Sequence, residues 1–132
     1  MADLWPSRAD HDTAAYWQGL GERRLLLARC TDCRHWIHPP KACCPACWSD
    51  NVGHDTPSGE ATLFSYLVQP VVPGGPAVVV AWAELREQER LLLVGELKDA
   101  TPETVRIGAR LVLDWEASRN LWVPAFRQEA VQ

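Results

Sequence analysis

The chain has 132 residues, of which 47% are hydrophobic and 23% charged, and its formal net charge at pH 7 is −4. This length allows one ordinary domain or two small ones, and no apolar run approaches the about 18 residues that a membrane helix needs. The first residues lack the basic and apolar regions of a signal peptide, so we expect a cytoplasmic protein that does not bind membranes.

The charge is distributed unevenly along the chain. Residues 1–53 carry six acidic and six basic side chains, whereas residues 54–132 carry eleven acidic and seven basic ones. The whole negative excess therefore lies in the C-terminal part. An acidic surface is a poor match for a polyphosphate backbone, which argues against nucleic-acid binding by this part of the chain.

Residues 1–22 are predicted to form an N-terminal helical segment. Asp10 or Asp12 can cap the start of a short helix, and Gly19 or Gly21 can end it. A helix of this length is marginal in isolation. We therefore expect it to pack on the rest of the chain or on a partner protein.

Two CxxC pairs, separated by ten residues, dominate the next segment. Four thiolates at this spacing form the ligand set of a tetrahedral structural zinc site. A strand, a knuckle, a return strand, a proline break and a second knuckle follow one another, which predicts a zinc ribbon at residues 23–54. Such a unit has little core, so zinc supplies roughly 10 kcal/mol or more of its folding free energy. The predicted ligands are Cys30, Cys33, Cys44 and Cys47.

A site closed by four protein thiolates has no position for water or substrate, so we expect a structural rather than a catalytic role. Iron binds the same ligand set, and the ribbon context favours zinc. Cys43 can replace Cys44 in another register, although CxxC geometry favours Cys44. As a nucleophile, Cys43 would need His35 or His38 as a base.

Residues 55–132 are predicted to be all-β and to form a five-stranded OB-fold barrel. Runs of β-forming residues alternate with turn signals at near-regular spacing, which is typical of a small barrel. Thr101 can begin one helical turn after the third strand. The predicted strands are residues 61–68, 77–85, 91–97, 109–115 and 121–123. The predicted fold class is mainly β, with an N-terminal helix, a zinc ribbon and a barrel.

Basic and aromatic residues are concentrated in the N-terminal half. The basic residues around the ribbon favour an ordinary solvated face, with an anion site as the alternative. The tryptophans of this small half, among them Trp17 and Trp36, are too many to be fully buried there. They can form a protein interface or pack against the barrel.

Motifs along nearly the whole chain resemble a known family. It comprises acyl-CoA-associated proteins, long described as a domain of unknown function, that join a rubredoxin-like zinc ribbon to an OB-fold. The matching motifs are Tyr16-Trp17, residues 25–30, Cys30-x-x-Cys33, Pro39-Pro40-Lys41, Cys44-Pro45-x-Cys47, Gly59 to Tyr66, Val80 to Leu85, Ile107-Gly108 and Pro124-x-Phe126.

Two departures from the family pattern stand out. Arg34 and Trp48 replace the glycine that often follows each knuckle, which leaves zinc ligation intact and predicts tighter knuckles. Gln88 or Glu89 stands where the family usually has a glycine turn. The geometry of the hairpin between the second and third strands of the barrel is therefore left open.

The resemblance implies a non-catalytic accessory subunit of a hetero-oligomeric complex that acts on acyl-CoA. The implied partner is a thiolase-superfamily enzyme, either a lipid-transfer-type aldolase or lyase or an acyltransferase, with a hotdog-fold enoyl-CoA hydratase of sterol side-chain degradation as the alternative. The subunit would stabilise the partner and help to bind the CoA thioester. On this interpretation, the candidate CoA-phosphate contacts are Arg23, Arg29 and Lys41. The candidate interface residues are Tyr16, Trp17, Trp36 and Phe126.

Two other functions are consistent with parts of the sequence. Zinc ribbons and OB-folds both occur in nucleic-acid-binding modules, where Phe64, Tyr66 and Trp82 could stack on bases, but the acidic barrel argues against nucleic acid as the partner. A free-standing enzyme would depend on Cys43. The sequence contains no convincing arrangement of catalytic residues that supports it.

Overall fold

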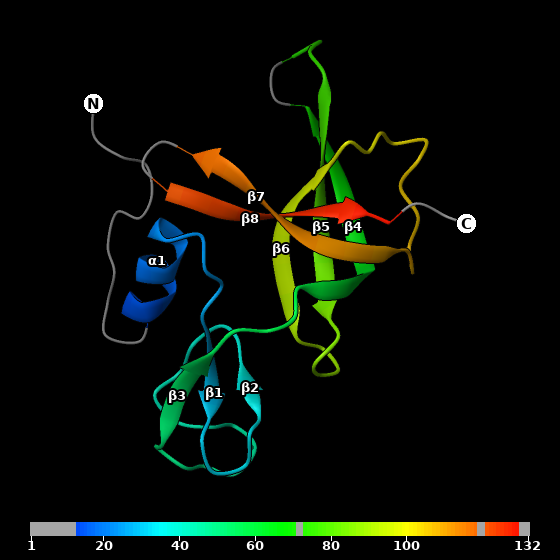
Figure 1. The fold of residues 1–132 in the computed structure, drawn as a ribbon. Helices are drawn as coiled ribbons and strands as arrows, with labels where there is room; N and C mark the ends of the chain where they lie inside the picture. The colour runs from blue at the N-terminus through cyan, green and yellow to red at the C-terminus, as the bar shows by residue number, and fades with distance from the viewer. Residues whose placement is uncertain (1–12, 71–72, 119–120, 130–132) are drawn as a thin grey trace. The chain divides into compact units, whose positions relative to one another are not determined.

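The computed structural model describes residues 13–70, 73–118 and 121–129. This part of the chain is mainly β, with one short helix, as the sequence predicted (Figure 1). It divides into two compact units. The first unit runs through Pro57 and includes the segment 117–123, and the second contains residues 58–116 and the chain from Pro124 onward.

Helix α1 (Ala14–Gly21) begins with Thr13 at the N-cap position; Asp10 and Asp12, the predicted caps, lie outside the described residues. The helix ends at Gly21, one of the two predicted ends. Beyond it, the Arg23 N–H donates to the Leu20 carbonyl at 3.2 Å and the Arg24 N–H donates to the Gly19 carbonyl at 2.8 Å. These two bonds form a Schellman motif, which satisfies the last helical carbonyls.

The ribbon sheet has the order β2-β1-β3 and is antiparallel throughout. Its strands are β1 (Leu27–Cys30), β2 (Trp36–Ile37) and β3 (Val52–Asp55). Strand β3 was not predicted, because one valine and one glycine give no apolar alternation. The core of this sheet is small and comprises Ala28, Cys30, Ile37 and Cys44, with Val52 packed against it. This small core agrees with a fold that depends on metal.

Most of the second unit forms a closed barrel with the strand order β4-β5-β6-β8-β7, in which the end of β7 and the start of β8 are grouped with the first unit. Its strands are β4 (Glu60–Pro70), β5 (Ala77–Leu85), β6 (Leu92–Lys98), β7 (Arg110–Ser118) and β8 (Leu121–Gln128). Strands β6 and β8, which are far apart in the sequence, pair in parallel. The closed five-stranded barrel confirms the predicted OB-fold. A Cβ atom on Gly95 would lie 2.6 Å from the Pro124 carbonyl oxygen, so glycine allows these two strands to approach.

The structure shows the geometry of two connections in the barrel that the sequence singled out. Residues 102–104 form a single turn, in which the Val105 N–H donates to the Thr101 carbonyl at 3.1 Å, and this agrees with the one helical turn predicted to begin at Thr101. Between β5 and β6, Arg90 has φ +64°, and its N–H donates to the Glu84 carboxylate at 2.8 Å. Arg90 therefore adopts, in this hairpin, the left-handed conformation that glycine adopts without steric cost.

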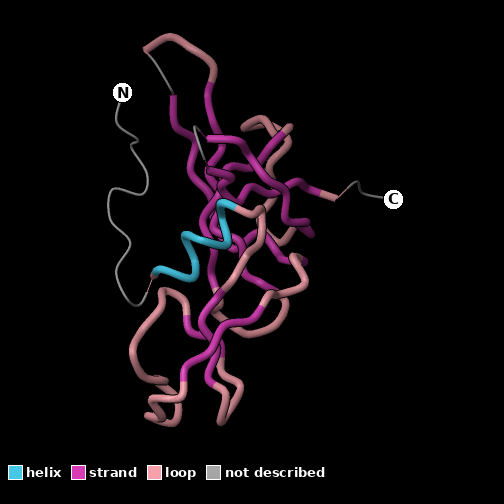
Figure 2. The backbone as a smooth tube through the Cα atoms, turned by 60° about the vertical axis from the view of Figure 1, so that its left-hand side comes forward, coloured by secondary structure: helices cyan, strands magenta, loops and turns pink. Residues whose placement is uncertain are grey.

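The β4–β5 hairpin extends as a two-stranded arm beyond the rest of its barrel (Figure 2). No helix in the described segments is both long enough and apolar enough to span a bilayer.

Candidate functional site

The sulfur atoms of Cys30, Cys33, Cys44 and Cys47 all lie within 4.8 Å of one another. The Sγ atoms of Cys30 and Cys47 are 3.6 Å apart, as are those of Cys33 and Cys44. Zn–S bonds of about 2.3 Å in a tetrahedron require sulfur atoms roughly 3.8 Å apart, so the four residues fit a zinc ion. The predicted ligand set is therefore brought together, with Cys44 rather than Cys43 in the cluster.

Both knuckles are closed by the same backbone bond. The Arg34 N–H donates to the Cys30 carbonyl at 3.0 Å, and the Trp48 N–H donates to the Cys44 carbonyl at 2.8 Å. The residue after each knuckle lies in the left-handed region, with φ +68° at Arg34 and +67° at Trp48. These are the two positions where the sequence departs from the family glycine, and the left-handed geometry explains why glycine is common there.

Side-chain bonds tie the first knuckle to the chain that follows the second. The Asp32 carboxylate accepts hydrogen bonds from the Ser49 hydroxyl and from the Asn51 amide, the latter at 3.0 Å. These two bonds, led by that from Ser49, lower the pKa of Asp32. Sequence reasoning missed this network, although an acid between two cysteine ligands was a visible signal.

The thiols influence one another's ionisation in a way that favours a bound cation. The Cys33 N–H lowers the pKa of Cys30 to about 7. At Cys47, the Ser49 N–H lowers the pKa, but burial and the neighbouring thiols outweigh it and raise the pKa to about 12. Four thiolates cannot share this space without a compensating positive charge. Zinc would supply that charge and fold-stabilising bonds, and four protein ligands leave it no open position for chemistry.

Two of the three candidate CoA-phosphate residues are already engaged within the first unit. The Arg23 guanidinium lies 3.8 Å from the centre of the Trp122 ring. Arg29 donates to Asp55 at 2.9 Å and lies 4.3 Å from the centre of the Trp36 ring. Lys41 is exposed in the loop after β2.

The candidate interface residues fall into two groups. Tyr16 and Trp17 are half-buried on α1, with ring centres 5.4 Å apart, and Tyr16 also lies 5.7 Å from His38. Burial raises the pKa of Tyr16 to about 12. Trp36 is only 4% exposed and Phe126 is fully buried, so their side chains serve the chain's own packing rather than a partner surface.

The barrel has an open pocket of about 660 Å³ at the end where β4, β7 and the β5–β6 turn meet. It is lined by acidic and basic side chains, among them Glu60, Arg86 and Arg110. Arg86 forms an ion pair with Glu60, which neutralises both groups. This polar rim holds no nucleophile–base pair among the described residues.

Comparisons with known proteins agree with this architecture. The family model described as the ChsH2 rubredoxin-like zinc ribbon domain matches residues 17–53, and that of the ChsH2 C-terminal OB-fold domain matches residues 55–116. A solved structure described as an Ltp2-ChsH2(DUF35) aldolase is 35% identical, with a TM-score of 0.80, and the match covers 91% of this chain and 96% of that one.

Two further relatives extend the comparison. A DUF35 protein of unknown function from Sulfolobus solfataricus shares the fold, with 16% identity, a TM-score of 0.65 and coverage of 92% of this chain and 87% of that one. A probable enoyl-CoA hydratase alpha subunit from Thermomonospora curvata is 37% identical over 128 residues, which are 93% of this chain. The match spans only 39% of that relative's length. The two domain matches in order, the four-cysteine cluster and the near-complete alignment with a ChsH2 chain establish that this protein belongs to the ChsH2 family of zinc-ribbon/OB-fold proteins.

Proposed function

We propose that this protein is a non-catalytic accessory subunit of an acyl-CoA-processing complex. The proposed partner is a thiolase-superfamily aldolase or lyase, or an acyltransferase, that acts on a bulky acyl-CoA such as a sterol side-chain thioester. The subunit binds and stabilises this partner. The observation that carries the proposal is the end-to-end likeness to a chain of an aldolase described as Ltp2-ChsH2(DUF35).

The chemistry of the chain supports an accessory role. Its most reactive groups, the four thiols, fit a closed metal site that presents no open coordination position. Cys43 lies outside that cluster and is half-buried, and the described residues do not pair it with a base. Chemistry on an acyl-CoA would therefore be supplied by the partner subunit.

A hotdog-fold hydratase is the second candidate partner, because the curated relative is named as a probable enoyl-CoA hydratase alpha subunit. For direct contact with CoA phosphates, Lys41 and Arg23 remain the better candidates, since both side chains are exposed. Arg29 is half-buried and ion-paired with Asp55, which reduces its value for an anion.

Nucleic acid is disfavoured by the barrel surface. Phe64 and Tyr66 are exposed, as base stacking requires. However, the chain between Glu60 and Glu84 contains no lysine or arginine that could contact phosphates. Single-strand binding combines aromatic platforms with a positively charged groove. Arg90, 5.2 Å from the centre of the Phe64 ring, supplies a single positive charge beside this surface.

Affinity capture of the tagged full chain from its source cells, with mass spectrometry of the eluate, tests the proposal. We expect near-stoichiometric recovery of a thiolase-superfamily subunit. The recovered subunit is then purified and assayed on acyl-CoA with and without this chain, and its activity or thermal stability should rise when the chain is present. Recovery of a hydratase would select the second candidate. Nucleic acid in the eluate, or no protein partner, would overturn the proposal.

A further inference from the structure

A long uncharged segment forms the most unusual surface of the barrel. Between Glu60 and Glu84 the sequence contains no acidic or basic residue and no histidine. This segment comprises most of β4 and β5, whose described residues include several that are exposed. Exposed strands in soluble proteins usually carry charges that prevent association with other chains.

The strand register shows which side chains face outward. Ala83 pairs with Leu93, and both are buried in the barrel. Because side chains alternate along a strand, the adjacent row, in which Ser65, Trp82 and Val94 are aligned, points to the outside. The next outward row aligns Leu67, Val80 and Glu96.

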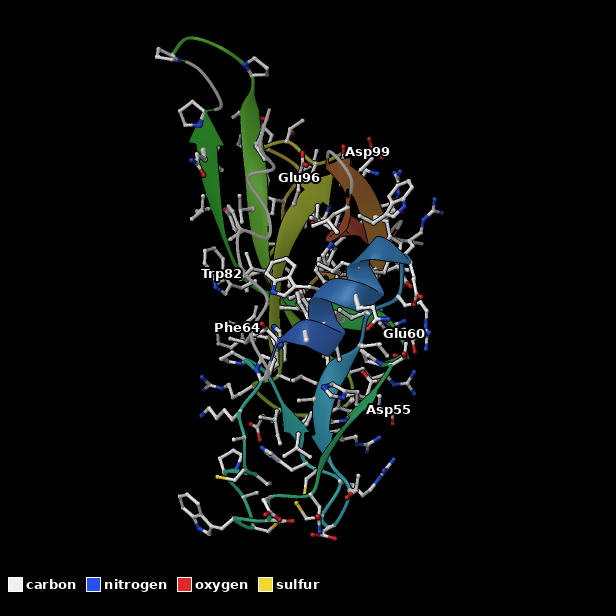
Figure 3. The ribbon with its side chains drawn as sticks, turned by 90° about the vertical axis from the view of Figure 1, so that its left-hand side faces the viewer. Asp55, Glu60, Phe64, Trp82, Glu96 and Asp99 are labelled. Atoms are coloured by element: carbon white, nitrogen blue, oxygen red, sulfur yellow. The ribbon has the colours of Figure 1, made fainter. Side chains whose placement is uncertain are left out.

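These outward rows are largely apolar. Val94 is 49% exposed and Leu67 is 39% exposed, while Val80 and Trp82 are half-buried. A register shift between Leu63 and Ser65 adds Phe64, which is 39% exposed and projects toward the same side as Trp82 (Figure 3). We call Phe64, Leu67, Val80, Trp82 and Val94 the outer apolar face.

The open edge of β4 lies alongside this face. Strand β4 pairs with β7 only from Glu60 to Thr62, and the last backbone bonds on that side join Leu63 to Ala109 and Gly108. Beyond Leu63, within the described residues, β4 pairs with β5 alone. The outer apolar face, which spans β4, β5 and β6, therefore adjoins the open edge of β4.

The charges that border this surface indicate the kind of protein that covers it. Glu84 and Glu96 lie in the outward rows, and the Arg90 guanidinium lies 5.2 Å from the centre of the Phe64 ring, so two carboxylates and one guanidinium border the face. If a second copy of this chain docked here by two-fold symmetry, it would present the same apolar rows and the same border, which has one more carboxylate than guanidinium. Like charges at an interface oppose association, whereas basic residues would complement them.

We propose that the outer apolar face docks a different protein subunit through an apolar surface bordered by lysine or arginine. This inference rests on the proposed function, which supplies the thiolase-superfamily subunit as the occupant. The face, rather than the buried Trp36 and Phe126, then provides the aromatic anchors that protein interfaces favour.

The test uses the full zinc-loaded chain and the thiolase-superfamily subunit purified after affinity capture, with binding measured by titration calorimetry. Leu67→Glu combined with Val94→Glu should raise the dissociation constant by about 100-fold, because two carboxylates would be buried against an apolar surface. The matched control combines Ile107→Glu with Val112→Glu, which also replaces two exposed apolar residues of the barrel and should change binding little.

Val94→Glu alone, at the most exposed position of the face, keeps the test valid if the double variant misfolds; circular dichroism and zinc content monitor folding. If the wild-type chain does not bind the subunit, the proposed function fails and this inference fails with it. If the wild type binds and the face variants bind equally well, the inference alone is overturned.

The charge of the border has its own test. Glu96→Lys should weaken binding to the same subunit by about tenfold, and the effect should diminish at high salt. Sedimentation of the isolated wild-type chain should show a monomer. A dimer that Leu67→Glu with Val94→Glu dissociates would overturn the proposal, because a second copy would then occupy the face.

Discussion

Trp48 combines two features that a folded chain usually avoids. Its backbone has φ +67°, a conformation that costs a residue with a Cβ about 1–2 kcal/mol, and its side chain is 77% exposed. Trp48 stands where the family often has glycine. The left-handed backbone at this position is the physical reason why glycine is common there. It could not be foreseen that tryptophan would adopt the same conformation.

Trp48→Gly should be more stable than Trp48→Ala by about 1 kcal/mol. Both variants remove the indole, so the comparison isolates the effect of a Cβ atom at a left-handed position. Denaturant unfolding of the zinc-loaded proteins at a fixed zinc concentration measures the difference. Equal midpoints would show that the left-handed backbone is relaxed in solution.

Zinc binding should release protons, and the affinity for zinc should fall as the pH falls. Without metal, the pKa of Cys47 is about 12, and burial and neighbouring thiols, outweighing the His35 N–H, also raise that of Cys33. Both thiols are therefore protonated at pH 7 and must lose their protons to bind zinc. Titration calorimetry in buffers of different ionisation enthalpy should give at least two protons per zinc ion. A release near zero would exclude thiolate ligation.

At the scale of the element, the end of α1 depends on one close approach. A Cβ atom on Gly19 would lie 2.6 Å from the carbonyl oxygen of Arg24, which bends back over the helix end in the Schellman motif. Nothing lies within 4 Å of the equivalent position on Gly21. The two helical glycines, which the sequence treated as alternative stops, therefore have different roles.

Gly19→Ala should destabilise the protein by about 1–3 kcal/mol, since the backbone must shift to admit the methyl group. Gly21→Ala should be neutral or stabilising by up to about 1 kcal/mol, because alanine is the better helix former. Thermal unfolding of the two variants beside the wild type gives both values. A stable Gly19→Ala protein would mean that the helix end can open without loss.

The elements with strong local signals were predicted well, and those created by long-range pairing were not. Strand β5 occupies the predicted residues 77–85, and the four ligands follow from knuckle spacing alone. Strand β3 exists because β1 offers an edge, and β8 continues past Pro124 because β6 pairs with it in parallel. Likewise, Trp36 and Phe126 are buried by tertiary packing, which composition does not reveal.

At the scale of the whole molecule, the two units have different sources of stability. The core of the ribbon sheet is four residues with Val52 beside them, two of the four being zinc ligands. The barrel instead buries a larger apolar set that includes Leu63, Leu85 and Phe126.

Removal of zinc should therefore unfold the ribbon and leave the barrel folded. With a chelator present, amide hydrogen exchange should become fast in β1, β2 and β3 and stay slow in β5 and β6. Peptide-level mass spectrometry before and after chelation measures the change. Equal loss of protection in both units would contradict this division and would indicate one cooperative structure.

The assignment of segment 117–123 to the first unit affects how the coding sequences of the two units can recombine. Because the chain leaves the first unit after Pro57 and returns to it at Ala117, no single cut separates ribbon from barrel. A gene fragment ending near residue 57 would lack Trp122, on which the Arg23 guanidinium stacks. Recombination near residue 57 would thus separate the first unit from part of its own chain. We therefore expect the ribbon and the barrel to be transferred between genes together.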